Sequence, residues 1–217
     1  MSNRTKSTRW SPARLALPAL SGLLILTGSL LGGCGNKGPT SVSEVEKLVK
    51  QGWVLFSSEE YTDALVKFDE ALEILSQTPD AHHGRGWSLA YLGRFNEARN
   101  ALVAAKELSL DDPDIWAGGA FIYSALGDQV QVVFWAETAF GVQEQVSQTT
   151  QWTFIRNTAI THIHLRLVLA KAYWTNGAYT QCINQLDTIE PGISHGGSAQ
   201  VLFDDLARLT AQYGSPF

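Results

Sequence analysis

A block of about 34 residues repeats along the chain, and this repeat constrains the fold more than any other feature. The pair Gly-Trp occurs at Gly52 and Trp53 and again 34 positions later at Gly86 and Trp87. Small and apolar residues recur at the same offset: Leu55 with Leu89, Ala64 with Ala98, Ala71 with Ala105, and Pro79 with Pro113. A unit of this length cannot bury enough apolar surface alone, so the period predicts stacked repeats.

The period and the residue types resemble the tetratricopeptide repeat, in which each unit is a pair of antiparallel helices, A and B. In that family a small residue lies where helix A meets helix B, an aromatic residue opens helix B, and alanines follow it. These positions hold Gly52, Tyr61, Ala64 and Ala71, then Gly86, Phe95, Ala98 and Ala105, then Ala120, Val132 and Ala139. The third unit departs from the pattern at Gln129, where an aromatic residue is expected.

The resemblance implies an all-α, right-handed α-solenoid of about four helical hairpins. The repeat domain would span residues 44–214, with repeats near 45–78, 79–112, 113–146 and 163–190. Glycine at the A–B turns suits the left-handed conformation that often ends a helix, and this predicts such turns at Gly93, Gly127 and Gly177. Trp116 and Trp135 are assigned to packing between helices.

The fourth unit is out of register with the other three. Gly177 and Tyr179 place its start near Ile163, so residues 147–162 are an insert. The stretch WTFI, Trp152–Ile155, has strand-like composition and little charge. Two interpretations remain open for the insert: a partner-binding loop, because long inserted loops are often functional, or a helix extension followed by a structural turn.

The last segment, 198–214, is amphipathic and is predicted to be a helix that caps the end of the stack. Its apolar residues would cover the fourth hairpin, and its charged residues would face outward. The apolar set is Val201, Leu202, Leu206 and Leu209, and the charged set is Asp204, Asp205 and Arg208.

The N-terminus resembles the signal peptide of a bacterial lipoprotein. Residues 1–33 hold four basic residues in their first 14 positions, no acid, and then an uncharged apolar run. The motif LGGC, Leu31–Cys34, resembles the lipobox, which implies cleavage before Cys34 and acylation of that cysteine. The alternative is an uncleaved anchor, since the run approaches the roughly 20 residues that span a bilayer. Residues 34–43 are interpreted as the lipidated cysteine and a flexible tether.

Charge and the anchor together predict where the protein acts. Without the four basic residues of the signal, 12 Lys and Arg stand against 21 Asp and Glu, about −9, which argues against nucleic acid. The lipoprotein resemblance implies the bacterial cell envelope. Gly35, rather than Asp, follows the cysteine, and in the enterobacterial sorting rule this implies the outer membrane, facing the periplasm.

In tetratricopeptide proteins the A helices line a concave groove, and the resemblance carries that role to specific residues here. The candidate partner-binding residues are Trp53, Phe56, His83, Trp87, Tyr91, Phe121, Lys171 and Trp174. Such an aromatic groove would suit the apolar face of a peptide or helix. The alternative is that the capping helix or the insert folds over the groove and covers these aromatic residues.

No motif for catalysis, metal or cofactor binding is present, so neither an enzyme nor a cofactor is predicted. His82 and His83 are adjacent and His162 and His164 are two apart, spacings unsuited to joint chelation of zinc on a helix. Cys182, at a small repeat position, is assigned to packing.

The predicted function is therefore a membrane-anchored scaffold that binds a protein or peptide in the envelope. Similar repeat lipoproteins assemble outer-membrane proteins, secretins or pili. The alternative is a small-ligand binder or a regulator of a cell-wall enzyme, with the groove closed into a pocket. Self-association of the repeats is a third possibility.

Overall fold

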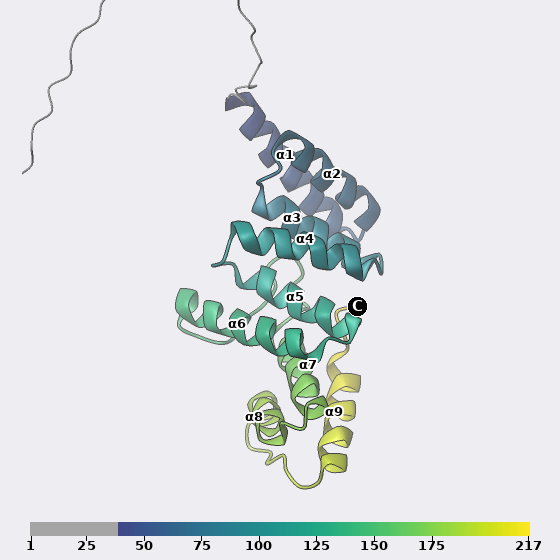
Figure 1. The fold of residues 1–217 in the computed structure, drawn as a ribbon, viewed down its shortest axis with the longest axis vertical. Helices are drawn as coiled ribbons and strands as arrows, with labels where there is room; N and C mark the ends of the chain where they lie inside the picture. The colour runs from purple at the N-terminus through teal and green to yellow at the C-terminus, as the bar shows by residue number, and fades with distance from the viewer. Residues whose placement is uncertain (1–38) are drawn as a thin grey trace, which may run out of the picture. The chain divides into compact units, whose positions relative to one another are not determined.

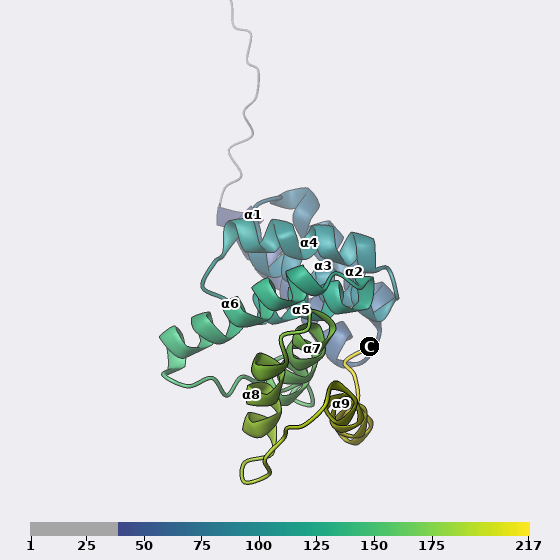
Figure 2. The same ribbon diagram turned by 60° about the horizontal axis from the view of Figure 1, so that its bottom comes forward.

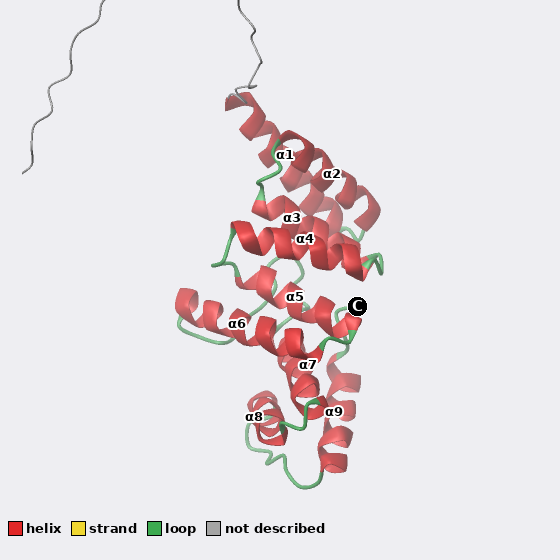
Figure 3. Ribbon diagram, in the orientation of Figure 1, coloured by secondary structure: helices red, strands yellow, loops and turns green. Residues whose placement is uncertain are grey.

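The computed structural model describes residues 39–217, which fold into α-helices joined by turns and loops (Figures 1 and 3). Within this part of the chain there are nine helices: α1 (Pro39–Ser57), α2 (Tyr61–Ile74), α3 (Pro79–Tyr91), α4 (Phe95–Leu108), α5 (Pro113–Leu126), α6 (Gln129–Ser147), α7 (His162–Thr175), α8 (Tyr179–Ile189) and α9 (Ala199–Tyr213). None of them is long and apolar enough to cross a bilayer. The predicted signal peptide and Cys34 lie outside the described residues.

The helices pair into four antiparallel hairpins that stack in chain order: α1 with α2, α3 with α4, α5 with α6, and α7 with α8. The odd-numbered helices α1, α3, α5, α7 and α9 also pack on one another in sequence, so they form one continuous side of the stack. We call this side the inner face. The predicted all-α solenoid of four hairpins is confirmed.

The turns between paired helices use the left-handed conformation at equivalent positions. Gly93, Gly127 and Gly177 have φ of 72°, 78° and 75°, as their positions predict. The first hairpin places Glu59 there, with φ of 64°, so its turn forms without glycine. The hairpin geometry therefore outweighs the preference of a side-chain-bearing residue for negative φ.

The small residues of the repeat allow close packing of the helices. A Cβ atom added to Gly52 would lie 2.7 Å from the Phe68 ring, and one added to Gly86 would lie 2.7 Å from Leu102. Real side chains do not approach that closely, so both positions require glycine unless the neighbouring ring or leucine moves. This explains why glycine precedes tryptophan twice at the same repeat position.

Helix α1 begins earlier than the sequence indicates. Residues 39–43, predicted to belong to the flexible tether, form its first turn. Pro39 stands at the helix start, where the fixed φ of proline suits the first turn and its missing N–H leaves no helical bond unmade. The sequence predicts a linker at Pro39, because proline is common both in linkers and at helix starts.

The capping helix is present as α9, and it packs on α7 and α8 (Figure 2). Its side chains Leu202, Leu206 and Leu209 are buried, whereas Val201 is exposed, so its assignment to the covering set was wrong. Ser198 caps the helix by accepting a hydrogen bond from the backbone N–H of Val201 at 3.4 Å.

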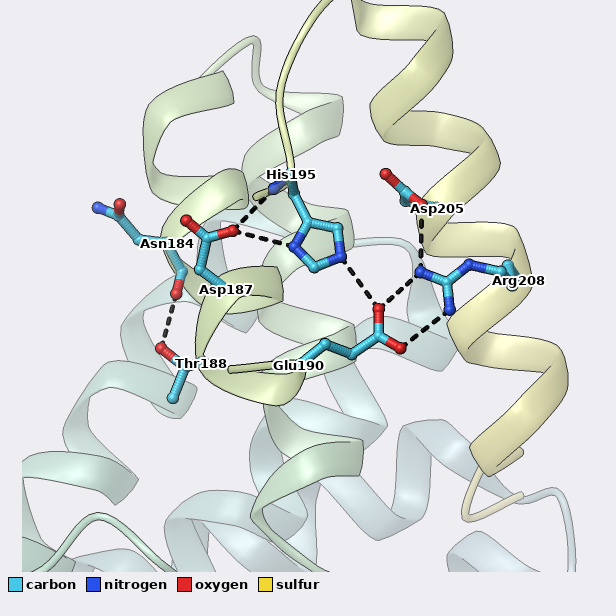
Figure 4. A network of polar contacts seen from close by, with 7 residues as sticks. All are labelled: Asn184, Asp187, Thr188, Glu190, His195, Asp205 and Arg208. Carbon is cyan, nitrogen blue, oxygen red and sulfur yellow. Dashed lines mark hydrogen bonds and ion pairs between the residues drawn. The ribbon is translucent and has the colours of Figure 1, made fainter. Parts of the chain in front are cut away.

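A polar network fastens the loop before α9 to both flanking helices (Figure 4). The buried ring of His195 lies between two carboxylates of the α8 end, with Nδ1 2.9 Å from Asp187 and Nε2 3.1 Å from Glu190. Glu190 also accepts two hydrogen bonds from Arg208 of α9, at 3.0 and 2.6 Å. This network joins the capping helix to the fourth hairpin.

Candidate functional site

The aromatic residues that repeat on the A helices lie on the inner face, but the chain itself covers them. Trp53, Trp87 and Phe121, from α1, α3 and α5, are all buried. Phe56 is buried as well, 5.4 Å from Trp53 in an edge-to-face arrangement. The prediction of an open groove at these positions is therefore wrong. The structure shows the alternative, a covered groove.

The cover is the segment between α6 and α7, Gln148–Thr161, which is the predicted insert 147–162 without its two end residues, because those belong to the flanking helices. We keep the name insert for Gln148–Thr161. Phe154 stacks on Trp87 with 4.3 Å between ring centroids and an angle of 16°. Trp152 lies 6.3 Å from Phe121. Both side chains of the insert are fully buried, and they complete the core of the first three hairpins.

The insert folds back on itself as a tight loop. The backbone N–H of Phe154 donates to the carbonyl of Ile160 at 2.9 Å, and that of His162 donates to the carbonyl of Trp152 at 2.6 Å. The strand-like composition of this stretch corresponds to one antiparallel bridge between Thr153 and Thr161. Because these backbone groups pair within the insert, it can enter an apolar environment.

Polar and charged side chains tie the insert to the first three hairpins. The indole N–H of Trp152 donates to Asp114 of α5 at 2.6 Å. Arg156 lies 4.6 Å from the Trp53 ring and 3.5 Å from Asp80 of α3. Asp80 in turn accepts a hydrogen bond from the Trp53 indole at 2.8 Å. The insert is thus attached at both ends of the row of aromatic residues.

Burial sets the protonation of two groups beneath the insert. It raises the pKa of the Asp114 carboxyl to about 7, although the hydrogen bond from Trp152 opposes the shift. It lowers the pKa of His83 to about 4. His83 is therefore neutral near pH 7, and its Nε2 accepts a hydrogen bond from the indole N–H of Trp87 at 2.9 Å. This predicted groove residue instead holds a tryptophan in place.

The last residues of the sequence cover a second part of the inner face. The Phe217 ring lies 5.3 Å from Tyr91, 5.8 Å from Trp87, 5.9 Å from Phe95 and 6.4 Å from Phe121. These four residues, with Phe217 on them, form what we call the aromatic socket. Tyr91, a predicted groove residue, is half-buried in it.

One end of the inner face is open, between α7 and α9. A hollow of about 420 Å³ lies there, lined by the remaining predicted groove residues, Lys171 and Trp174, and by residues of α9 that include Phe203. The Trp174 indole N–H donates to the carbonyl of Ala199 at 2.9 Å, which fixes the ring 5.2 Å from Phe203. Phe203 remains 47% exposed.

A second hollow, of about 650 Å³, lies at the other end of the inner face. Residues of α1, the start of α3, and Ile155 and Arg156 of the insert line it. Its mouth carries both signs of charge, Lys50 and Arg156 against Glu46 and Asp80, so it shows no charge preference for a ligand.

The polar residues at the starts of α5 and α7 have structural roles. Asp112 accepts the N–H of Asp114 at 2.9 Å and caps α5, as their place at a helix start indicates. His164 accepts the N–H of Thr161 at 3.1 Å in a capping box at the start of α7. In residues 39–217 no group of three His, Cys, Asp or Glu is placed to hold a metal ion. Burial raises the pKa of the Cys182 thiol to about 11, which fits its assignment to packing.

Three features of the inner face were not predicted by residue. The covering aromatic residues Trp152 and Phe154 stood in a segment with two open interpretations. Phe203 is not part of the repeat pattern. Its place among the polar residues of the amphipathic segment 198–214 is the one sequence signal that points to its exposure. Phe217 lies in a stretch too short to show any period.

Comparison with known proteins finds the same fold at low sequence identity. The chain is similar to YrrB, described as a TPR protein with an unusual peptide-binding site (TM-score 0.57, 15% identity, 81% of this chain and 84% of that one). It is also similar to MamA (0.54, 14%, 80% and 84%) and to a tetratricopeptide repeat protein from Parabacteroides merdae (0.53, 16%, 81% and 61%). No family model and no curated protein matches the chain. The tetratricopeptide fold implied by the repeat is therefore confirmed.

Proposed function

Proceeding from this tetratricopeptide fold, we propose that the chain is an interaction scaffold of the bacterial cell envelope. It is held at the membrane by lipid on Cys34 and binds a protein partner in the hollow between α7 and α9. The lipobox-like LGGC motif supports the anchor, and the exposed Phe203 beside the partly buried Trp174 in the hollow supports the binding surface. Assembly of an envelope complex of outer-membrane proteins, a secretin or a pilus is the role that fits this combination.

The observation that carries the proposal is the exposure of Phe203 beside Trp174. Elsewhere on the inner face the large aromatic side chains are covered by the insert or by the tail, yet here two rings 5.2 Å apart border open space. Aromatic residues contribute much of the energy of protein interfaces. Trp174 is already fixed by its hydrogen bond, so less conformational entropy is lost when a partner binds.

The shape of the hollow favours a protein segment over a small ligand. Its lining comes from two neighbouring helices, α7 and α9, whereas small-molecule sites enclose most of the ligand surface. Within residues 39–217 no carboxylate pairs with Lys171 at its edge. The matching partner is a helix or extended segment with a large apolar side chain and a carboxylate placed near Lys171.

The test is site-specific photocrosslinking in the organism's own envelope, with a benzophenone amino acid at position 203 or 201. Val201 is the matched control, because it lies on the same helix with 45% exposure but outside the hollow. We expect a discrete crosslinked partner from position 203 and not from 201, and at least tenfold less of it in the Lys171→Glu variant. Equal products from both positions would refute the proposed surface.

The anchor is tested separately. Cys34→Ser should abolish labelling by a fatty-acid probe and release the protein from the membrane fraction. Continued labelling of this variant would show that the lipid is attached elsewhere or that the LGGC interpretation is wrong.

A further inference from the structure

The aromatic socket on the inner face is occupied by a residue of the same chain, Phe217. Phe217 packs on rings from three helices, α3, α4 and α5, although the helix that precedes it, α9, packs at the far end of the stack. Figure 1 marks this chain end beside the middle hairpins. The socket therefore takes a phenylalanine side chain that arrives on an extended segment.

The socket has its shape without Phe217. Trp87 is held by His83 and by the stacked ring of Phe154. Tyr91 stacks on Tyr61 with 4.4 Å between centroids and an angle of 14°, and its hydroxyl accepts a hydrogen bond from Asn157 at 3.2 Å. A preformed site of this kind binds an incoming ring without ordering its own walls.

Few interactions keep Phe217 in the socket. After α9 ends at Tyr213, Gly214 turns the chain with φ of 84°. Residues 215–217, within the described structure, form no hydrogen bond or ion pair, and Phe217 keeps 36% of its surface exposed. Beside this segment lies a hollow of about 550 Å³, lined by Tyr91, Asn157 and Pro216 among others. An incoming segment that replaces the tail would find room for its neighbouring residues there.

We propose that the aromatic socket is a docking subsite for a phenylalanine of an extended partner segment, and that the tail Gly214–Phe217 is its displaceable intramolecular competitor. The proposal deepens the proposed function and rests on it, because it assumes that the inner face receives a partner. A tethered competitor acts at an effective concentration in the millimolar range, so only a partner that binds elsewhere as well, or binds tightly, opens the subsite.

The test uses a fluorescent peptide with the sequence Gln-Tyr-Gly-Ser-Pro-Phe, a copy of residues 212–217, and full-length protein purified in detergent. In anisotropy titrations Phe217→Ala should bind this peptide at least tenfold more tightly than wild type does. The same peptide ending in alanine should not bind. Adding Phe95→Ala to the Phe217→Ala protein should weaken binding at least tenfold, with circular dichroism confirming that the double variant is folded.

Further outcomes separate this proposal from its alternatives. Equal affinity for wild type and Phe217→Ala, or no binding to either, would overturn it. A wild-type dimer that Phe217→Ala converts to a monomer would show that the tail binds a second copy, which also overturns it. Phe203→Ala should leave peptide binding unchanged, since Phe203 lies outside the socket. The result is thus independent of whether the hollow between α7 and α9 binds a partner.

Discussion

The insert and the tail both cover the inner face, but they are held in different ways. The insert places Trp152 and Phe154 in the core, and its indole and guanidinium groups bind Asp114 and Asp80. The tail places one half-exposed ring, Phe217, on the socket, and only ring contacts hold it. The insert is part of the folded core, whereas the tail lies on the surface of that core.

The attachment of the two segments to the fold adds to this difference. The insert is fixed at both ends, by α6 and α7, so closing it over the face orders a short loop. Within the described residues the tail is joined to the fold through α9, and each of its residues loses backbone freedom when it docks. An aromatic surface can therefore be covered in two ways. The covering segment is either a permanent part of the core or a segment that binds reversibly. Four substitutions test this distinction, from the largest expected effect to the smallest.

Phe154→Ala is expected to have the largest effect. It removes a fully buried ring that stacks on Trp87, and such truncations lower the free energy of unfolding by about 3–5 kcal/mol. Urea denaturation followed by tryptophan fluorescence measures the loss. The control is the neighbouring residue Ile155, which is 72% exposed and whose alanine variant should change stability by less than about 0.5 kcal/mol. A loss below 1 kcal/mol for Phe154→Ala would mean that the insert, like the tail, only rests on the face.

Asp114→Asn is expected to stabilise the protein at high pH. The folded pKa of Asp114, about 7, lies above its ordinary value of 3.8. The folded state therefore binds the proton more tightly, and stability falls as pH rises from about 4 to 7. Asparagine keeps the acceptor for Trp152 and carries no charge, so the variant should match wild type near pH 4 and exceed it by about 1–3 kcal/mol at pH 8. The same difference at both pH values would exclude the buried charge as its cause.

The framework of the molecule could be predicted from the sequence because it is periodic. The 34-residue spacing located the hairpins, and Gly93, Gly127 and Gly177 marked turns that need a left-handed residue. The buried face of the capping helix followed from helical spacing at Leu202 and Leu206. Each of these features depends on local conformation or on a repeated contact, and both leave a regular pattern in the sequence.

The state of the inner face could not be predicted, because it depends on contacts between residues far apart in sequence. Trp87 has the same spacing whether a partner or Phe154 covers it. The contact between Phe217 and Trp87 joins residues 130 positions apart, and no repeat pattern predicts it. Asp114 stands at a helix start, where an acid is common, and its raised pKa comes from burial in the folded chain, which its local sequence does not show.

Phe217→Ala is expected to lower the free energy of unfolding by about 1 to 1.5 kcal/mol, which corresponds to roughly tenfold competition by the tail. The ring is only partly buried, and the entropy recovered by the freed tail offsets part of the lost contact. The same urea denaturation measures the loss of unfolding free energy in both variants. The ratio of the loss in Phe217→Ala to the loss in Phe154→Ala compares how strongly the tail and the insert are held. A loss above about 2 kcal/mol would make the tail a fixed part of the core and would contradict its role as a displaceable competitor.

Glu190→Gln is expected to have the smallest effect, and it acts on the helix that carries the tail rather than on the tail itself. The hydrogen bonds from Arg208 lower the pKa of Glu190 to about 2. Its contribution to stability is therefore present above about pH 4.5 and is lost as pH falls toward 2. The pair is close to solvent, so we expect a loss of only a few tenths of a kcal/mol at pH 7, reduced further by 1 M salt.

The useful readout for Glu190→Gln is hydrogen exchange, because it resolves the two covers separately. Loosening the link between α8 and α9 should raise exchange in α9 at pH 7 while the amides of Phe154 and Ile160 in the insert keep their protection. At pH 2.5, where the carboxylate contribution is fading in wild type, the two proteins should converge. If exchange rises equally in the insert, then the insert and the capping helix open as one unit, and the separation between a fixed and a reversible cover does not hold.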